Sequence, residues 1–408
     1  MAMDCPALDG EPLVEAREGL ARLCVPDPKR YLRPDGVYEP AWAPVFYNPR
    51  MAFNRDVAVV FLRAWAKLRG VDEPVVVEPL AGSGVRAVRY ALEAGAGRVY
   101  AVDIDPVAVR LAEINIEVNK VADRVYLAQG DANAFLHTLR SKKARVHLVD
   151  LDPFGSPAPF IEASLAALRG RGVLAATATD TAPLTGTHPA ALRRRYDVVP
   201  GRSFLEKEQA VRILAGYIIR RAASREYGAK VLLAYYADYY VRVYVELVPG
   251  ARRADKSLES LAYLAFCPKC GIAWYASKPW RPGGCPRCGS QPQLIGPVYA
   301  GPLCDEKLVD EMIRVASEAS WLSNQARTLE LLRQLREECG LVNPHYRVDK
   351  VASVLKVNMP SPRLVVEELR RLGYRATLTH FDKRGVRSDA PPDVIYNVVW
   401  RLSPSNAG

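Results

Sequence analysis

The chain has 408 residues, more than one ordinary hydrophobic core holds and enough for two domains. Hydrophobic residues make up 49% and charged residues 25%, proportions that exclude a disordered chain and indicate a folded one. Lys and Arg outnumber Asp and Glu by 56 to 45, and the net charge of +11 fits either a polyanionic partner or a well-solvated, Arg-rich surface.

No stretch of the sequence approaches the roughly 20 apolar residues that a membrane-spanning helix needs. Residues 1–20 also lack the basic start and apolar stretch of a secretory signal. We therefore expect a cytoplasmic protein with no membrane association, and nothing in the sequence calls for an obligate protein partner.

Short apolar runs alternate with helical patterns between residues 75 and 180. The segment 106–120 has apolar residues at intervals of three and four, as in an amphipathic helix. Apolar runs that alternate with such helices predict an α/β fold, a Rossmann-like domain whose parallel central sheet is covered on both faces. Functional loops of such folds lie at the carboxyl ends of the strands. The predicted strands are 75–77, 98–102, 124–127, 145–149 and 172–176.

The remainder of the chain predicts a longer helix over 205–226 and two strands within 230–248 that form an antiparallel edge of the sheet. Pro249 and Gly250 then give a turn signal. We expect one domain at 1–250 and a C-terminal α+β domain at 251–408, with a cysteine module over about 266–294. Its tail, about 340–404, resembles a winged-helix element, with an amphipathic helix over 363–375 and a basic hairpin-like segment over 377–387.

The first predicted strand ends in a glycine-rich turn that reads Glu78-Pro-Leu-Ala-Gly82-Ser-Gly84. Glycines here permit positive φ angles and let a ligand approach the backbone closely. An acidic residue such as Glu78 at the strand end is typical of methyltransferases. Gly82-x-Gly84-x-x-Ala87, with Asp103 about twenty residues on, equally fits the dinucleotide-binding fingerprint of a nicotinamide-dependent dehydrogenase.

Acidic residues at the ends of the next two strands favour the methyltransferase interpretation. Asp103 can accept hydrogen bonds from both hydroxyls of a ribose, although it could instead cap the following helix, a role that suits Asp105 better. Asp131 and the backbone amide of Ala132 can bind an adenine edge. An adenosine held at successive strand ends, without a second pyrophosphate site, predicts S-adenosylmethionine as the cofactor.

The fourth strand runs into a loop that reads Asp150-Leu-Asp152-Pro153-Phe154-Gly-Ser-Pro. Asp150 and Asp152 are two residues apart on a strand, so they should face the same side. The loop resembles the Asp/Asn-Pro-Pro-aromatic motif of amino-methyltransferases. Asp152 and the carbonyl of Pro153 could accept both protons of a weakly nucleophilic amine, and Phe154 could stack on its base. An ordinary Asp-Pro turn and ordinary packing of Phe154 are the competing interpretations.

Eight cysteines in a chain of this length do not suggest a disulfide scaffold. Cys267 and Cys270 are followed, after fourteen residues, by Cys285 and Cys288, in two Cys-Pro-x-Cys-Gly motifs. This spacing predicts a zinc-ribbon-like insert with a closed, structural site of four thiolates, and two disulfides are the alternative. The other four, Cys5, Cys24, Cys304 and Cys339, are scattered, and we interpret them as structural or incidental.

Several motifs together resemble the tRNA guanine-26 N2-dimethyltransferase family, over nearly the whole chain. They are residues 45–56 (VFYNPRMAFNRD), the glycine loop with Arg86, residues 150–157 (DLDPFGSP), residues 176–184 (ATATDTAPL), residues 234–236 (AYY), residues 379–381 (THF) and residues 390–391 (AP). The resemblance implies transfer of methyl groups from S-adenosylmethionine to N2 of guanine-26 in tRNA. The products would be N2-methylguanine and N2,N2-dimethylguanine.

The resemblance also implies roles for individual residues. Arg55 and Arg86 would contact the cofactor through its carboxylate, although Arg55 beside Asp56 also reads as a solvated helix charge. Phe46 and Phe154 would flank the guanine, Asp152 would be the catalytic acceptor, and the basic tail would bind tRNA phosphates. An amino-methyltransferase that acts on another RNA, on DNA or on a protein amine remains the alternative.

Overall fold

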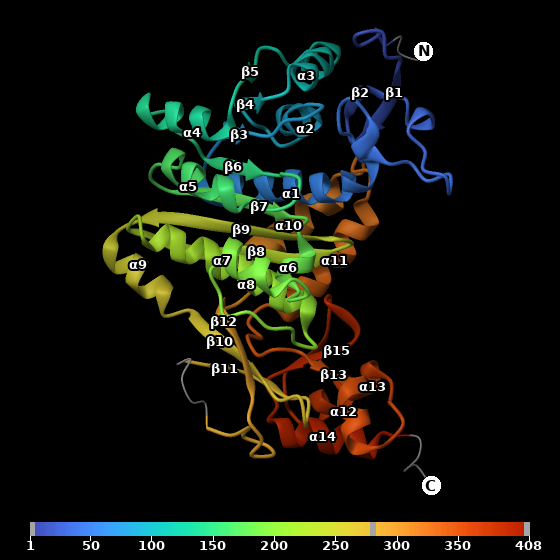
Figure 1. The fold of residues 1–408 in the computed structure, drawn as a ribbon, viewed down its shortest axis with the longest axis vertical. Helices are drawn as coiled ribbons and strands as arrows, with labels where there is room; N and C mark the ends of the chain where they lie inside the picture. The colour runs from blue at the N-terminus through green and yellow to red at the C-terminus, as the bar shows by residue number, and fades with distance from the viewer. Residues whose placement is uncertain (1–4, 278–282, 404–408) are drawn as a thin grey trace. The chain divides into compact units, whose positions relative to one another are not determined.

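The computed structural model describes residues 5–277 and 283–403 of the chain (Figure 1). Its contacts divide the chain into two compact units. The first comprises Met1–Pro153, Pro159–Ala176 and Asp310–Leu332, and the second comprises Phe154–Ala158, Thr177–Val309 and Arg333–Gly408. The predicted domains, 1–250 and 251–408, were divided at the turn signal of Pro249 and Gly250, and this division stays a prediction.

The largest sheet has seven strands in the order β5-β4-β3-β6-β7-β9-β8. Strands β3 to β7 are mutually parallel, whereas β8 and β9 form an antiparallel hairpin. The Rossmann-like fold class and its antiparallel edge are therefore confirmed. The strands are β3 (Val75–Glu78), β4 (Arg98–Asp103), β5 (Val125–Gln129), β6 (Leu148–Leu151), β7 (Gly172–Ala178), β8 (Tyr227–Ala237) and β9 (Tyr240–Pro249).

Helices follow the parallel strands in the alternation that the sequence predicts. Every residue of β6 and β7 is buried, as expected for central strands covered on both faces. At the start of α3, the Asp105 side chain accepts a 2.8 Å hydrogen bond from the Val107 N–H, so Asp105 is the helix cap. The helices are α1 (Ala52–Arg69), α2 (Val85–Glu93), α3 (Pro106–Val118), α4 (Ala132–Ser141), α5 (Ala158–Ala167), α6 (Thr181–Leu184), α7 (Pro189–Tyr196) and α8 (Glu206–Ala223).

An N-terminal hairpin, β1 (Leu13–Glu18) and β2 (Ala21–Pro26), was not predicted from the sequence. Asn115 of α3 holds β2 by accepting a 2.7 Å hydrogen bond from the Cys24 N–H and donating one of 3.1 Å to the Cys24 carbonyl. The hairpin delivers Glu18 into the protein interior. Three short 3-10 helices follow it, at Pro28–Arg30, Pro40–Trp42 and Pro49–Met51.

The C-terminal part contains two small antiparallel sheets, ordered β11-β10-β12 and β13-β15-β14. The helix predicted over 363–375 is α13, and the basic hairpin-like segment is β14 with β15; the winged-helix comparison stays a prediction. The elements are α9 (Ala251–Leu258), β10 (Leu261–Phe266), β11 (Ala273–Ala276), β12 (Gln293–Tyr299), α10 (Glu306–Glu318), α11 (Gln325–Glu338), β13 (Tyr346–Arg347), α12 (Val348–Leu355), α13 (Pro362–Arg371), β14 (Ala376–Thr379), β15 (Asp382–Ser388) and α14 (Pro392–Arg401).

A buried ionic cluster connects α8 with the C-terminal elements of the second unit. Glu208 of α8 accepts hydrogen bonds from Arg212 at 2.8 Å and Arg387 at 2.9 Å, and its other oxygen lies 2.5 Å from His345 Nδ1. Burial alone would raise the pKa of Glu208, but Arg387 and Arg212 hold it well below its usual range. A buried carboxylate is stable here because it is fully paired.

The four scattered cysteines form two disulfide bonds, a pairing that the sequence did not predict. Cys5 is bonded to Cys24, which lies on β2, and Cys304 is bonded to Cys339. These pairs are 19 and 35 residues apart in sequence, and only the fold brings them together.

Among the described residues, no helix is long and apolar enough to cross a membrane.

Thiol counting tests the two disulfides. In denaturant with a chelator and no reductant, we expect four of the eight cysteines to react with an alkylating reagent, and all eight after reduction, as measured by mass spectrometry. Reduction should also lower the free energy of unfolding by about 2–4 kcal/mol per bond, because the unfolded chain is released from a closed loop. Alkylation of all eight cysteines before reduction would show that the bonds are absent.

Candidate active site

Three carboxyl groups surround the buried guanidinium of Arg86, which lies in the first turn of α2 directly after the glycine loop. Its Nε lies 3.6 Å from Glu78 at the end of β3, and its Nη1 lies 3.4 Å from Asp150 of β6. Its Nη2 donates a short hydrogen bond to Asp152 Oδ2. Only 2% of the Arg86 side chain is exposed, so these ionic contacts are shielded from water.

Asp150 and Asp152 do face the same side, since both reach Arg86. The Asp150 side chain is fully buried and accepts a hydrogen bond from the Tyr90 hydroxyl, whereas 18% of the Asp152 side chain is exposed. Asp150 therefore helps to position Arg86 from the protein interior and is not accessible to a substrate. Asp152 is the carboxylate that a substrate can reach.

Glu78 lies in an electrostatically unfavourable position for a carboxylate. Burial raises the pKa of Glu78 to about 8, the negative charges of Asp150 and Asp152 add to this effect, and Arg86 opposes it. Its Oε2 accepts no hydrogen bond from the described residues. One guanidinium thus faces three carboxyl groups, and Glu78 is the one that retains its proton near neutral pH.

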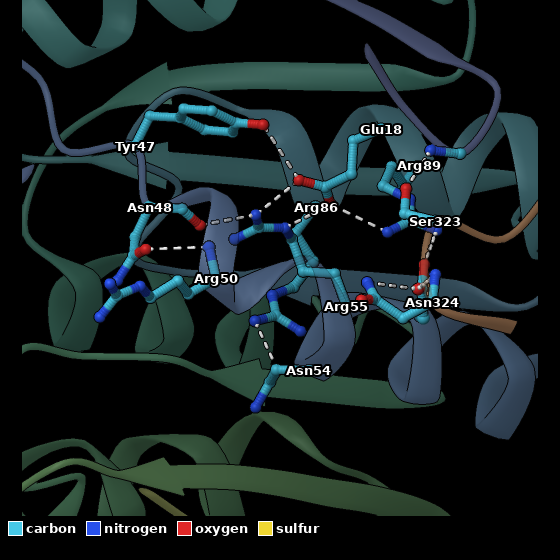
Figure 2. A network of polar contacts seen from close by, with 12 residues as sticks. Glu18, Tyr47, Asn48, Arg50, Asn54, Arg55, Arg86, Arg89, Ser323 and Asn324 are labelled. Carbon is cyan, nitrogen blue, oxygen red and sulfur yellow. Dashed lines mark hydrogen bonds and ion pairs between the residues drawn. The ribbon is translucent and has the colours of Figure 1, made fainter. Parts of the chain in front are cut away.

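Asn54 of α1 is a residue of this site that the sequence reasoning missed. Its Oδ1 accepts a 2.9 Å hydrogen bond from the same Arg86 nitrogen that binds Asp152, and Figure 2 shows this pair. Its Nδ2 is buried and has no hydrogen-bond partner in the described chain. Asn54 lies within the motif 45–56. Because α1 is buried on almost every side, the hydrophobic periodicity of the sequence did not distinguish Asn54 from its neighbours as a site residue.

Arg55 lies in a second buried network, formed with the N-terminal hairpin. Its guanidinium donates two hydrogen bonds of 2.6 Å to the carboxylate of Glu18 and one of 3.1 Å to the Asn48 carbonyl (Figure 2). Arg89 also donates to Glu18, at 2.9 Å. Burial would raise the pKa of Glu18, but Arg55 and Arg89 lower it to about 2. Arg55 is buried rather than solvated, and a cofactor carboxylate at its guanidinium would compete with Glu18.

The glycine loop is fixed by Asp103 at the end of β4. Asp103 Oδ2 accepts a 2.7 Å hydrogen bond from the Gly82 N–H, and Oδ1 accepts one of 3.0 Å from the Asp105 N–H. Each carboxylate oxygen has a second lone pair, so a ribose hydroxyl can still bind. Gly84 has a φ of 73°, and a Cβ atom there would lie only 2.9 Å from that of Ala112 on α3.

The adjacent strand end supplies further groups suited to an adenosine. Asp131 is exposed and caps α4 through a 2.8 Å hydrogen bond from the Ala134 N–H. Ala132 is the first residue of α4, where a backbone N–H has no acceptor within the helix. Ile104, beside Asp103, exposes 68% of its surface, an apolar face that the sequence reasoning did not single out. The donors, acceptors and apolar surface of these strand ends fit an adenosine-bearing cofactor.

The aromatic residues predicted to flank the substrate base differ in exposure. The side chain of Phe154, which follows the buried Pro153, is 74% exposed. Phe46 is partly buried, and its carbonyl oxygen would lie 3.7 Å from a Cβ atom at Gly82. The backbone at Phe46 therefore borders the glycine loop.

Comparison with known proteins places this geometry in a family. Residues 25–400 match the family described as N2,N2-dimethylguanosine tRNA methyltransferase. The chain belongs to this family. Two tRNA (guanine(26)-N(2))-dimethyltransferases are each 41% identical to it: that of Metallosphaera sedula, with 92% of this chain and 94% of the relative covered, and that of Aeropyrum pernix, with 96% and 98% covered.

A solved structure of a family member shares the fold. Trm1 from Pyrococcus horikoshii, in complex with S-adenosyl-L-methionine, superposes with a TM-score of 0.82 at 35% identity, over 95% of this chain and 100% of the other. The family resemblance inferred from the motifs is thereby confirmed. The dehydrogenase interpretation of the glycine loop is set aside.

The four cysteines of the insert form a cluster in the second unit. All four sulfur atoms lie within 4.8 Å of one another, and none is in a disulfide bond. Zn–S bonds are about 2.3 Å long, so tetrahedral ligation by four sulfurs needs them just under 4 Å apart, and the cluster fits Zn²⁺. Burial raises the pKa of the Cys270 and Cys285 thiols, a cost that a bound cation offsets.

The four-cysteine cluster is continuous with a hydrophobic core of the same unit. Cys267, Cys270 and Cys285 pack with Val351 of α12 and Tyr396 of α14, and the Tyr396 hydroxyl donates a hydrogen bond to the Cys270 carbonyl. Such a site supports the fold rather than the chemistry, because four thiolates leave no open position for water.

The Glu78 pKa predicts a pH dependence of stability. Its pKa is about 8 in the folded protein and about 4.5 in the unfolded chain, so the folded state binds more protons between these values. The free energy of unfolding should therefore fall as pH rises from about 4.5 to 8, by at most about 1.4 kcal/mol per pH unit for one proton. Chemical denaturation at several pH values should show a shallower decline in Glu78→Gln. Parallel curves for the two proteins would contradict the pKa assignment.

Removal of zinc should destabilise the second unit and leave the cofactor site intact. Structural Zn²⁺ contributes on the order of 10 kcal/mol to small zinc domains, so chelation or Cys285→Ser should clearly lower the temperature of the corresponding calorimetric transition. Elemental analysis should find one zinc per chain, and zinc re-addition should restore the chelated protein. A zinc-free protein with the same unfolding profile would show that the cluster holds no structural metal.

Proposed function

We propose that this protein transfers methyl groups from S-adenosylmethionine to the exocyclic N2 of guanine-26 in tRNA, giving N2-methylguanine and N2,N2-dimethylguanine. The observation that carries the proposal is the partly exposed Asp152, held by Arg86 directly after the glycine loop, in a chain of this family. The named activity of the curated relatives agrees with it.

Asp152 is suited to act as the acceptor for the substrate amine. The lone pair of a guanine N2 is delocalised into the ring, so the amine is a weak nucleophile. The Asp152 Oδ2 is bound by Arg86, while its Oδ1 accepts no hydrogen bond from the described chain. Oδ1 and the Pro153 carbonyl would accept hydrogen bonds from the two amine protons and orient the lone pair. Asp152 Oδ1 would then take up one of these protons as the N–C bond forms and the bond between the sulfonium sulfur and the methyl group breaks.

S-Adenosylmethionine supplies an electrophilic methyl group on a sulfonium sulfur. Around it we assign Asp103 to the ribose hydroxyls and Asp131 with the Ala132 N–H to the adenine edge, where Ile104 would give an apolar surface. Gly82 and Gly84 allow close approach at the loop, and Glu78 lies at its start. Arg55 and Arg86 are assigned to the carboxylate end of the cofactor, with Glu18 as the competitor at Arg55.

Phe46 and Phe154 are assigned to the substrate base. The exposed ring of Phe154 would stack on a guanine extruded from the RNA, as an enzyme that acts on a base requires. Four cysteines, Cys267, Cys270, Cys285 and Cys288, are assigned to a structural Zn²⁺. The basic C-terminal elements are assigned to tRNA phosphates, and the protein to the cytoplasm.

Substitution of Asp152 tests the proposed chemistry. Asp152→Ala removes the acceptor but leaves Arg86 paired with Asp150 and Glu78, so the protein should fold. We expect methylation to fall by about 10²- to 10⁴-fold, the usual contribution of a positioned base, with unchanged affinity for S-adenosylmethionine by calorimetry. Turnover that is unaffected would refute the role of Asp152.

The matched control is Asp123→Ala, an exposed acid paired only loosely with Arg124, which should retain full activity. Mass spectrometry of nucleosides from the treated tRNA would identify the product, its position and whether one methyl or two are added. Labelled methyl transfer to duplex DNA or protein, and none to tRNA, would favour the alternative amine substrates instead.

A further inference from the structure

Three consecutive arginines end helix α7 in the second unit. Arg193, Arg194 and Arg195 are all exposed, in the last turn of the helix. Arg195 forms an ion pair of 3.0 Å with Asp180. Arg193 and Arg194 have no acidic partner within the described parts of the chain. One cation at a helix C-terminus is favourable, but three adjacent ones repel each other, so the helix dipole alone does not account for the cluster.

A chain of hydrogen bonds connects this helix end to the loop that carries Phe154. The Tyr196 hydroxyl donates to Asp180 Oδ1 at 2.8 Å and lies 2.8 Å from the Ser156 hydroxyl. Nearby, Gly155 and Thr179 are joined by two hydrogen bonds: the Gly155 N–H donates to the Thr179 hydroxyl, and the Thr179 N–H donates to the Gly155 carbonyl.

Hydrogen bonds therefore connect the arginine cluster to the loop that carries Phe154, within the second unit. Tyr196 is fully buried, and its carbonyl also accepts a 2.5 Å hydrogen bond from Arg220 of α8, which fixes the end of α7 from the other side. A fixed helix end with exposed guanidinium groups can bind phosphate oxygens with little loss of conformational freedom beyond the arginine side chains.

We propose that Arg193, Arg194 and Arg195 form a phosphate-binding surface for the RNA backbone next to the substrate nucleotide. This inference rests on the proposed function, because it takes Phe154 as a contact of the extruded base. A base drawn out of an RNA keeps its flanking phosphates close to the enzyme, and these phosphates need cationic partners where the base enters. Arg195 contacts the RNA and Asp180 together, and it thereby couples phosphate binding to the Phe154 loop.

The test compares two double variants of the full-length protein. Arg193→Gln/Arg194→Gln removes two exposed charges from α7 and spares the Arg195–Asp180 pair. Lys142→Gln/Lys143→Gln removes two exposed charges from the segment between α4 and the amino end of β6, which lies away from the carboxyl ends of the strands, and is the matched control. The affinity of each protein for unmodified tRNA is measured as a function of salt concentration, and methylation kinetics are measured alongside.

Neutralising two phosphate contacts should reduce the slope of log affinity against log salt by about 2 in the α7 variant and leave the control unchanged. The KM for tRNA should rise by about tenfold or more, with kcat at saturating tRNA nearly retained. A wild-type slope in the α7 variant, or an equal reduction in both variants, would overturn the proposal. A wild-type protein that binds tRNA but methylates no guanine would instead contradict the proposed function, and the binding slopes would still decide this inference.

Discussion

The buried contact of Arg86 with three carboxyl groups is the interaction on which the candidate site depends. A single guanidinium cannot neutralise Glu78, Asp150 and Asp152 together, and the structure resolves this imbalance by raising the pKa of Glu78 and by binding Asp150 to Tyr90. Asp152 is then left with one oxygen held and the other available. The geometry of the acceptor is thus set by the electrostatics beneath it rather than by the loop alone.

A second buried network secures the surroundings of the site. Glu18 comes from the N-terminal hairpin, Arg55 from α1 and Arg89 from α2, so one carboxylate joins three elements of the first unit (Figure 2). The Asp103 carboxylate plays a similar part at the glycine loop, through its bonds to the N–H groups of Gly82 and Asp105. Charged side chains of the first unit therefore hold its elements together, in addition to any role in ligand binding.

The sequence predicted what is encoded locally. The parallel strands, the positions of Gly82, Asp103 and Asp152 at their carboxyl ends, and the four-cysteine cluster follow from short motifs and hydrophobic periodicity. The partners of Arg55 and Arg86 were not predictable, because Glu18 lies 37 residues from Arg55, and Asp152 lies 66 residues from Arg86. For the same reason the contact of Asn54 with Arg86 and both disulfide bonds were not predicted. Pairing between distant residues is decided by the fold, and no spacing rule of the sequence reports it.

The most direct test of the account is a crystal structure with S-adenosylhomocysteine and a guanine-containing RNA. In this complex we expect Asp152 to bind Arg86 through one oxygen and to accept a hydrogen bond from guanine N2 through the other. The amine should face the sulfur of the cofactor product. An Asp152 carboxylate turned away from the amine, with guanine N2 bound by another residue, would contradict the account.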